Sequence, residues 1–222
     1  MYRSKSDPIN NHQGLLNMNK LFKISLLLLL ITLFGCQKYQ TALPENQTSN
    51  RPVEIQTSET YLHPESTFEL PATVESFQRV SLTRFDKQGL DVGAGYKLQN
   101  DPCNLTVTIY LYPTPSMQLI GTDQDVINSI EASWLEQEYS TVKKQILYGY
   151  TGAQVITEQP TVDNGHTGHQ GIFQFQNKKS VLKLYVVDHR WFVKHRYTYP
   201  SNCANKAEVA LQTLENNIPP RS

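Results

Sequence analysis

The feature that most restricts the fold of this chain is a strict alternation of side chains over residues 104–112. Every second position carries an aliphatic residue, namely Leu105, Val107, Ile109 and Leu111, and the positions between them are Thr or Tyr. Successive side chains of a β-strand point to opposite faces of its sheet. The run therefore predicts a strand with one buried face.

The same pattern, in shorter stretches, predicts further strands with polar connections, which favour antiparallel neighbours. Two segments predict helices instead. The first begins after Thr122 as N-cap, and the second carries an apolar stripe at helical spacing. The order of strands, helix, strands and helix predicts an α+β domain, with two main helices packed on a mostly antiparallel sheet. The expected strands are 77–85, 90–98, 104–112, 171–176, 181–187 and 191–199, and the expected helices are 123–147 and 204–216.

The amino-terminal part carries the pattern of an export signal. An uncharged apolar run over residues 24–34 follows Lys20 and Lys23. It is too short to span a membrane, which takes about 20 apolar residues, but it is typical of the core of a signal peptide. The run ends in Leu-Phe-Gly-Cys36, which matches the lipobox of bacterial lipoprotein signals. We therefore expect a signal peptide over residues 1–35, whose start can be Met18, and a lipid on Cys36.

Residues 37–60 are rich in Gln, Asn, Thr, Ser, Pro and Glu, and their apolar residues follow no period. Such a composition predicts a flexible tether from the lipidated Cys36, so residues 36–60 are assigned to it and residues 61–222 to the single α+β domain. Gln37 is not the Asp that retains enteric lipoproteins in the inner membrane. The expected location is the outer membrane, anchored by the lipid, facing the periplasm or the cell surface.

The remaining cysteines, Cys103 and Cys203, form an even pair in an oxidising compartment, which predicts a disulfide. Two free thiols are the alternative. Residues 36–222 hold 16 basic and 19 acidic residues, a net acidic body that argues against nucleic acid as a partner.

A glycine-rich segment places His166 and His169 three residues apart, close to Asp163. Two imidazoles and a carboxylate could share a transition metal. The ligand set is incomplete, however, and a polar hairpin loop has the same composition. His166 and His169 are thus weak metal candidates, and we expect neither a metal nor another cofactor.

The run 188–197 interleaves basic and aromatic residues. Alternation sends Lys194 and Arg196 to the face opposite Trp191, Val193 and Tyr197. This predicts a solvated basic face behind a buried aromatic one. The alternative is contact of the basic face with an anionic envelope polymer or with lipid headgroups.

The layout of residues 70–218 resembles uncharacterised exported proteins and lipoproteins of Gram-negative bacteria. At the level of the fold it is similar to the PsbP-like arrangement of sheet and helices. Neither resemblance implies an activity, because the shared motifs are strand patterns. They are Leu70-Pro71-Ala72, Phe77-Gln78-Arg79, Tyr96, the run 107–112 and the run 194–200.

The sequence contains no G-x-S-x-G, H-E-x-x-H, P-loop or dinucleotide fingerprint. We therefore expect a noncatalytic lipoprotein whose domain binds a protein or a component of the cell envelope. A hydrolase whose catalytic residues come together only in the folded protein would carry none of these motifs. The alternative is a small-ligand carrier or sensor whose pocket is lined by tyrosines of the strands, namely Tyr96, Tyr110, Tyr112, Tyr197 and Tyr199.

Overall fold

A computed structural model describes residues 51–116, 121–163 and 165–218. These residues belong to one compact unit, Ser49–Ser222. The predicted signal peptide, the predicted lipidation site Cys36 and most of the predicted tether lie outside the described residues. None of the described helices is long and apolar enough to span a bilayer.

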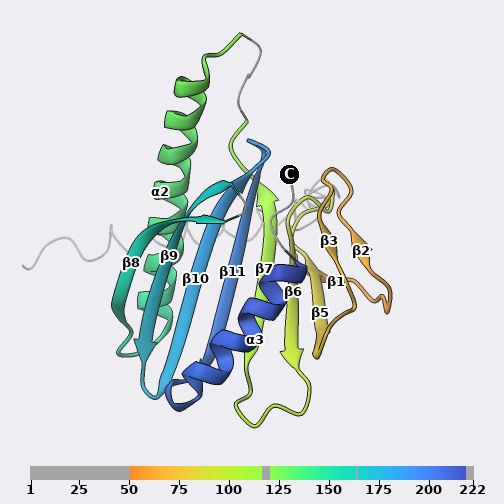
Figure 1. Ribbon diagram of the computed structural model, residues 1–222. Helices are drawn as coiled ribbons and strands as arrows, with labels where there is room; N and C mark the ends of the chain where they lie inside the picture. The colour runs from red at the N-terminus through yellow and green to blue at the C-terminus, as the bar shows by residue number, and fades with distance from the viewer. Residues whose placement is uncertain (1–50, 117–120, 164, 219–222) are drawn as a thin grey trace, which may run out of the picture. The chain divides into compact units, whose positions relative to one another are not determined.

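The unit is built on a nine-stranded sheet in which every pair of neighbours is antiparallel (Figure 1). The strand order is β1-β5-β6-β7-β11-β10-β9-β8, and β4 also pairs with β5. The predicted α+β class, with a mostly antiparallel sheet and two main helices, is confirmed. The strands are β1 (Val53–Glu54), β4 (Thr73–Val74), β5 (Phe77–Arg84), β6 (Val92–Leu98), β7 (Thr106–Pro113), β8 (Gln154–Asp163), β9 (His166–Phe175), β10 (Lys178–Val187) and β11 (Trp191–Pro200).

The two helices pack on opposite faces of this sheet. Helix α2 (Gln124–Gly149) lies against β9 and β10, and α3 (Ala204–Asn217), which follows the short helix η1 (Ser201–Cys203), lies against β11 (Figure 1). The N-cap of α2 is Asp123, one residue after the expected Thr122, and its carboxylate accepts a hydrogen bond from the backbone N–H of Asp125 at 2.8 Å.

Each face of the sheet carries its own hydrophobic core. On β11, Val193 belongs to the core beneath α3. The preceding residue, Phe192, points to the other face and belongs to the core beneath α2. Both side chains are almost fully buried. Strands β10 and β11 are therefore apolar on both faces, which is how a sheet covered from both sides is stabilised.

A segment that we call the N-terminal strap, residues 53–74, lies against the sheet. It contains β1, β4 and the small pair of β2 (Tyr61–Leu62) with β3 (Glu69–Leu70). The Arg79 guanidinium donates hydrogen bonds to three backbone carbonyls of the strap, those of Leu70, Thr57 at 3.0 Å and Glu59 at 2.7 Å. The sheet thus starts before the expected boundary at residue 61. Hydrogen bonds to their backbone, from β5 and from Arg79, hold residues 53–59 in place. Because these residues show no apolar period, their composition had indicated a flexible tether.

Strand β8, absent from the sequence-based expectation, forms a free edge of the sheet. It contains Pro160, and its register with β9 shifts between Val155 and Thr157. Both are common on edge strands. Strand β9 begins at His166, five residues before the expected start, because the glycine-rich segment pairs with β8 and is not a loop.

Candidate functional site

The two cysteines predicted to pair lie together, with their sulfur atoms 2.07 Å apart and their Cα atoms 6.0 Å apart. Cys103 precedes β7 and Cys203 precedes α3, so the bridge fixes the start of the helix to the sheet. A buried carboxylate supports the same corner. Asp101 accepts hydrogen bonds from the backbone N–H of Cys103 and of Leu105, and Lys206 of α3 lies 3.2 Å from it.

The two weak metal candidates do not share a site. His166 and His169 both lie on β9, and side chains three apart on a strand point to opposite faces. The His169 ring faces α2, where it lies 5.2 Å from the Tyr139 ring and 3.5 Å from the Glu136 carboxylate. Among the residues described, no cluster of three His, Cys, Asp or Glu side chains could hold a metal ion.

Lys194 and Arg196 lie on the face opposite Val193, as alternation predicted, but that face is not simply solvated. Lys194 is half-buried, with Nζ 4.4 Å from the ring centroid of Tyr110 and 5.0 Å from that of Tyr112. Burial lowers the pKa of Lys194. The expectation of a solvated basic face is wrong because the face borders α2, whose Glu138 accepts a hydrogen bond from Tyr112.

The five tyrosines expected to line one pocket are divided between the two faces. Tyr110 and Tyr112 lie on the α2 face with Lys194, whereas Tyr96, Tyr197 and Tyr199 belong to the core beneath α3. Tyr96 donates a hydrogen bond to the carbonyl of Pro71 in the strap at 2.9 Å.

Tyr197 and Tyr199 line a hollow of about 380 Å³ beside α3. Here Tyr197 donates a hydrogen bond to the Glu215 carboxylate at 2.6 Å, and Lys183 contacts the same oxygen at 2.6 Å. Because the hydroxyl hydrogen is used on Glu215, the 2.9 Å contact between Tyr197 and His195 requires a hydrogen on the imidazole Nδ1.

His195 is 1% exposed, and its Nε2 has no hydrogen-bond partner among the described residues. Burial is the main reason that its pKa falls to about 4. The network from His195 through Tyr197 to Glu215 joins the sheet to α3. Within it, the imidazole Nε2 of His195 is buried without a hydrogen-bond partner among the described residues.

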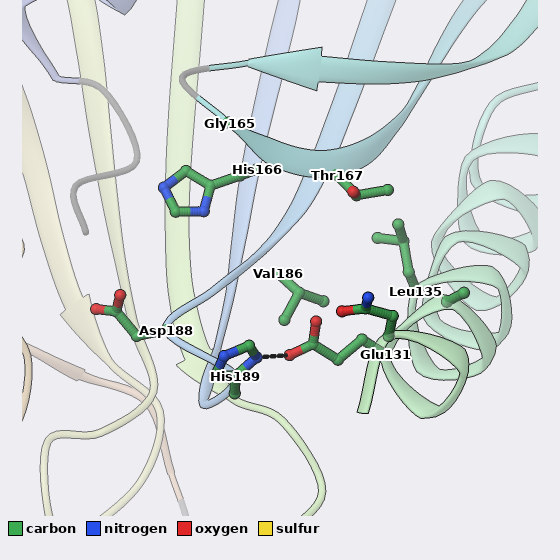
Figure 2. Close-up of a pocket in the computed structure, with 10 residues that line it drawn as sticks. Glu131, Leu135, Gly165, His166, Thr167, Val186, Asp188 and His189 are labelled. Atoms are coloured by element: carbon green, nitrogen blue, oxygen red, sulfur yellow. Dashed lines mark hydrogen bonds and ion pairs between the residues drawn. The ribbon is translucent and has the colours of Figure 1, made fainter. Parts of the chain in front are cut away.

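A second pocket, with a volume of about 420 Å³, lies where α2 meets the ends of β8, β9, β10 and β11 (Figure 2). Its floor is apolar, formed by Leu135 of α2 and Val186 of β10, both buried. Polar side chains surround the floor. They are Asn128, Glu131, His166, Thr167, Asp188 and His189.

The central contact of this pocket joins α2 to the turn between β10 and β11. His189 Nδ1 lies 2.5 Å from a carboxylate oxygen of Glu131, as Figure 2 shows. An ionised carboxylate can only accept, so Nδ1 carries the hydrogen and Nε2 of the neutral ring is an acceptor. The Glu131 side chain is 18% exposed and that of His189 is 40% exposed, so the imidazole remains accessible.

The turn that presents His189 adopts an uncommon backbone conformation. Asp188 and His189 have φ angles of 52° and 58°, in the left-handed region that residues other than glycine seldom adopt. Such conformations cost about 1 kcal/mol or more each and occur often at functional sites. Thr114 stabilises the turn by donating a hydrogen bond to the carbonyl of His189 at 3.2 Å.

His166 lines the opposite side of the pocket, and its Nε2 is buried without a hydrogen-bond partner among the described residues. The neighbouring Thr167 is paired across the strands with Val162, which is 70% exposed. The sequence singled out His166 only as a weak metal candidate, and it did not indicate Glu131 or His189. No signal of spacing could reveal that pair, because 58 residues separate its members.

Comparison with known proteins gives a likeness of fold. No protein-family model and no curated protein matches the sequence. A Pseudomonas aeruginosa protein of unknown function is similar in structure, with 12% identity and a TM-score of 0.40 over 73% of this chain and 97% of that one. Cyanobacterial PsbP (CyanoP) from Synechocystis is similar with 10% identity and a TM-score of 0.38, over 75% and 89% of the two chains. A protein with the expected PsbP-like fold is thus among the structural neighbours, and the lipoprotein family remains a prediction.

Proposed function

We propose that this protein is a lipoprotein of the bacterial envelope, anchored in the outer membrane through Cys36, whose folded domain binds a protein or another envelope component without catalysis. One observation carries the proposal. The pocket of Figure 2 combines an apolar floor with polar groups that the fold already orients, chiefly His189 held by Glu131. Ligand sites generally combine these two properties.

Two features favour binding over catalysis. An imidazole held by a carboxylate can serve as a general base, but a hydrolase with a covalent intermediate also needs a nucleophile within reach of the imidazole. No serine or cysteine is among the described residues that line the pocket, and no hydrogen bond joins the hydroxyl of Thr167, which does line it, to the His189 imidazole. The exposed Val162, which pairs across the strands with Thr167 next to the pocket, is instead an apolar side chain that a bound partner would remove from water.

Site-specific photocrosslinking tests the binding proposal. A photoreactive amino acid at Asn128, on the pocket wall, is compared with one at Val209, which is 70% exposed on α3. Crosslinking in the native envelope, followed by mass spectrometry, should capture a discrete partner from position 128 and not from 209. The proposal is wrong if both positions yield the same abundant envelope proteins.

The anchor is tested separately. Replacing Cys36 by Ala removes the thiol that would accept the lipid. The variant should move from the detergent phase to the aqueous phase on phase separation, and metabolic labelling with a fatty acid should disappear. A Cys103→Ala, Cys203→Ala variant is the control for loss of cysteine elsewhere and should keep the label. Retention of the Cys36→Ala variant in the detergent phase would exclude the lipid anchor.

The hollow beside α3 favours the second candidate, a small-ligand carrier, because Tyr197 and Tyr199 line it together. A Leu211→Trp substitution would fill this space, since Leu211 lines it from α3. Native mass spectrometry should then detect a small molecule on the wild-type protein but not on the variant. An equal ligand load on both proteins contradicts the carrier function at this place.

A further inference from the structure

We infer that the pocket of Figure 2 receives the cationic end of a lysine or arginine side chain on a protein partner. The inference rests on the proposed function and adds the chemical class of the group that enters the pocket. Its evidence is the charge of the lining, the hydrogen-bonding roles of the polar atoms and the apolar floor.

The described lining carries two carboxylates, those of Glu131 and Asp188, and no lysine or arginine side chain. The nearest basic residue in the sequence, Arg190, is engaged elsewhere. Its guanidinium lies 5.6 Å from the ring centroid of Trp191 and 3.3 Å from the Glu65 carboxylate. An anionic group entering the pocket would meet two carboxylates, whereas a cation would meet the opposite charge.

The polar atoms around the floor are mostly acceptors. Because His189 donates Nδ1–H to Glu131, its Nε2 is an acceptor when the ring is neutral. The carboxylate of Asp188 can only accept, and the side-chain amide of Asn128 offers an oxygen. Guanidinium and ammonium groups are donors only, with five and three N–H bonds respectively. They are the side-chain groups that complement such a lining most fully.

The floor suits the rest of such a side chain. Leu135, Val186 and Ala132 form apolar surface below the polar rim. Lysine and arginine side chains pack their methylene stems on apolar surface while the charged group stays among polar partners. Figure 2 shows Glu131 and His189 next to Val186, with Leu135 on the neighbouring helix, so an inserted side chain could reach the Glu131 and His189 pair across this floor.

Binding of small probes to the whole protein tests the charge assignment. N-acetylarginine amide is compared with N-acetylcitrulline amide, which has nearly the same shape but is neutral, and affinities are measured by NMR titration. The arginine probe should bind at least about tenfold more tightly, since citrulline lacks the positive charge and carries a carbonyl acceptor in place of one donor group. Glu131→Gln and Asp188→Asn should each weaken the arginine probe by about tenfold and leave the citrulline probe unchanged.

Asp188→Asn is the safer variant for folding, because Asn tolerates the left-handed conformation of that position. Glu136→Gln is the matched control, since Glu136 lies on the same helix, is 67% exposed and does not line the pocket. Equal binding of both probes, or no effect of both carboxylate variants, overturns the inference. If position 128 still captures a partner, the proposed function stands and only the charge assignment fails. If position 128 captures none, both fail.

Discussion

The buried His195 should make folding sensitive to acid, and replacing it by Phe should remove that sensitivity. The imidazole is 1% exposed, and protonation would leave a buried N–H at Nε2 without an acceptor among the described residues. Burial therefore lowers the pKa of His195 from 6.5 to about 4. Glu215 opposes this shift and Lys183 adds to it, and both are smaller effects than burial.

The sign and size follow from proton linkage. Between pH 6.5 and pH 4 the unfolded chain binds a proton on His195 that the native protein does not bind, so acidification favours unfolding. The lowered pKa of His195 corresponds to a total loss of about 3 kcal/mol once the pH is below 4. Between pH 7.5 and pH 5, the same relation gives a loss of about 2 kcal/mol from this residue alone.

Urea unfolding of the wild type and of His195→Phe, at pH 7.5 and at pH 5, measures this difference. Other titrating groups affect both proteins, so the wild type should lose about 2 kcal/mol more than the variant over this interval. Val193→Ala is the control, because Val193 is fully buried on the same strand and does not titrate. It should lower stability equally at both pH values. A difference between wild type and His195→Phe of less than about 0.5 kcal/mol would refute the reasoning.

Three further predictions concern packing and cross-links. Gly171→Ala should destabilise the protein by about 1–3 kcal/mol, because the added methyl group would collide with the Tyr139 hydroxyl, and thermal unfolding measures it. Reduction of the Cys103–Cys203 bridge, which closes a separation of 100 residues, should cost up to about 4.7 kcal/mol, and urea titration with and without reductant would reveal the loss. Arg79→Met should release the strap carbonyls and so speed amide hydrogen exchange in the strap, while the amides of α3 stay protected. Unchanged exchange in the strap would show that the guanidinium contacts do not hold it.

The alternating pattern of the sequence was sufficient to predict the strands that carry a buried face. Strand β7 and its aliphatic residues illustrate this, and every one of its buried positions follows period 2. Strand β8 escaped prediction because an edge strand with exposed residues on both faces needs no alternation. The part of the strap before residue 61 escaped because the pairing of β1 with β5 and the guanidinium of Arg79, rather than a periodic apolar pattern, hold it to the sheet.

The candidate pocket was almost invisible to sequence reasoning, and the physical reason is topological. Glu131 comes from α2, His189 from the turn after β10, and His166 from the start of β9. Only the antiparallel order of the sheet brings these three ends together. The sequence marked His166 as unusual, but it paired this residue with His169, which the strand geometry sends to the other face.

The free edge at β8 would matter for crowding if the protein is anchored at a membrane, as proposed above. Ten residues of strand without an outer neighbour would normally allow two molecules to join edge to edge. Pro160 offers no N–H to a neighbouring strand, and the register shift near Val155 bends the edge. Molecules held by lipid anchors diffuse in two dimensions at a high effective concentration. An interrupted edge of this kind would let such molecules collide repeatedly without merging their sheets into one.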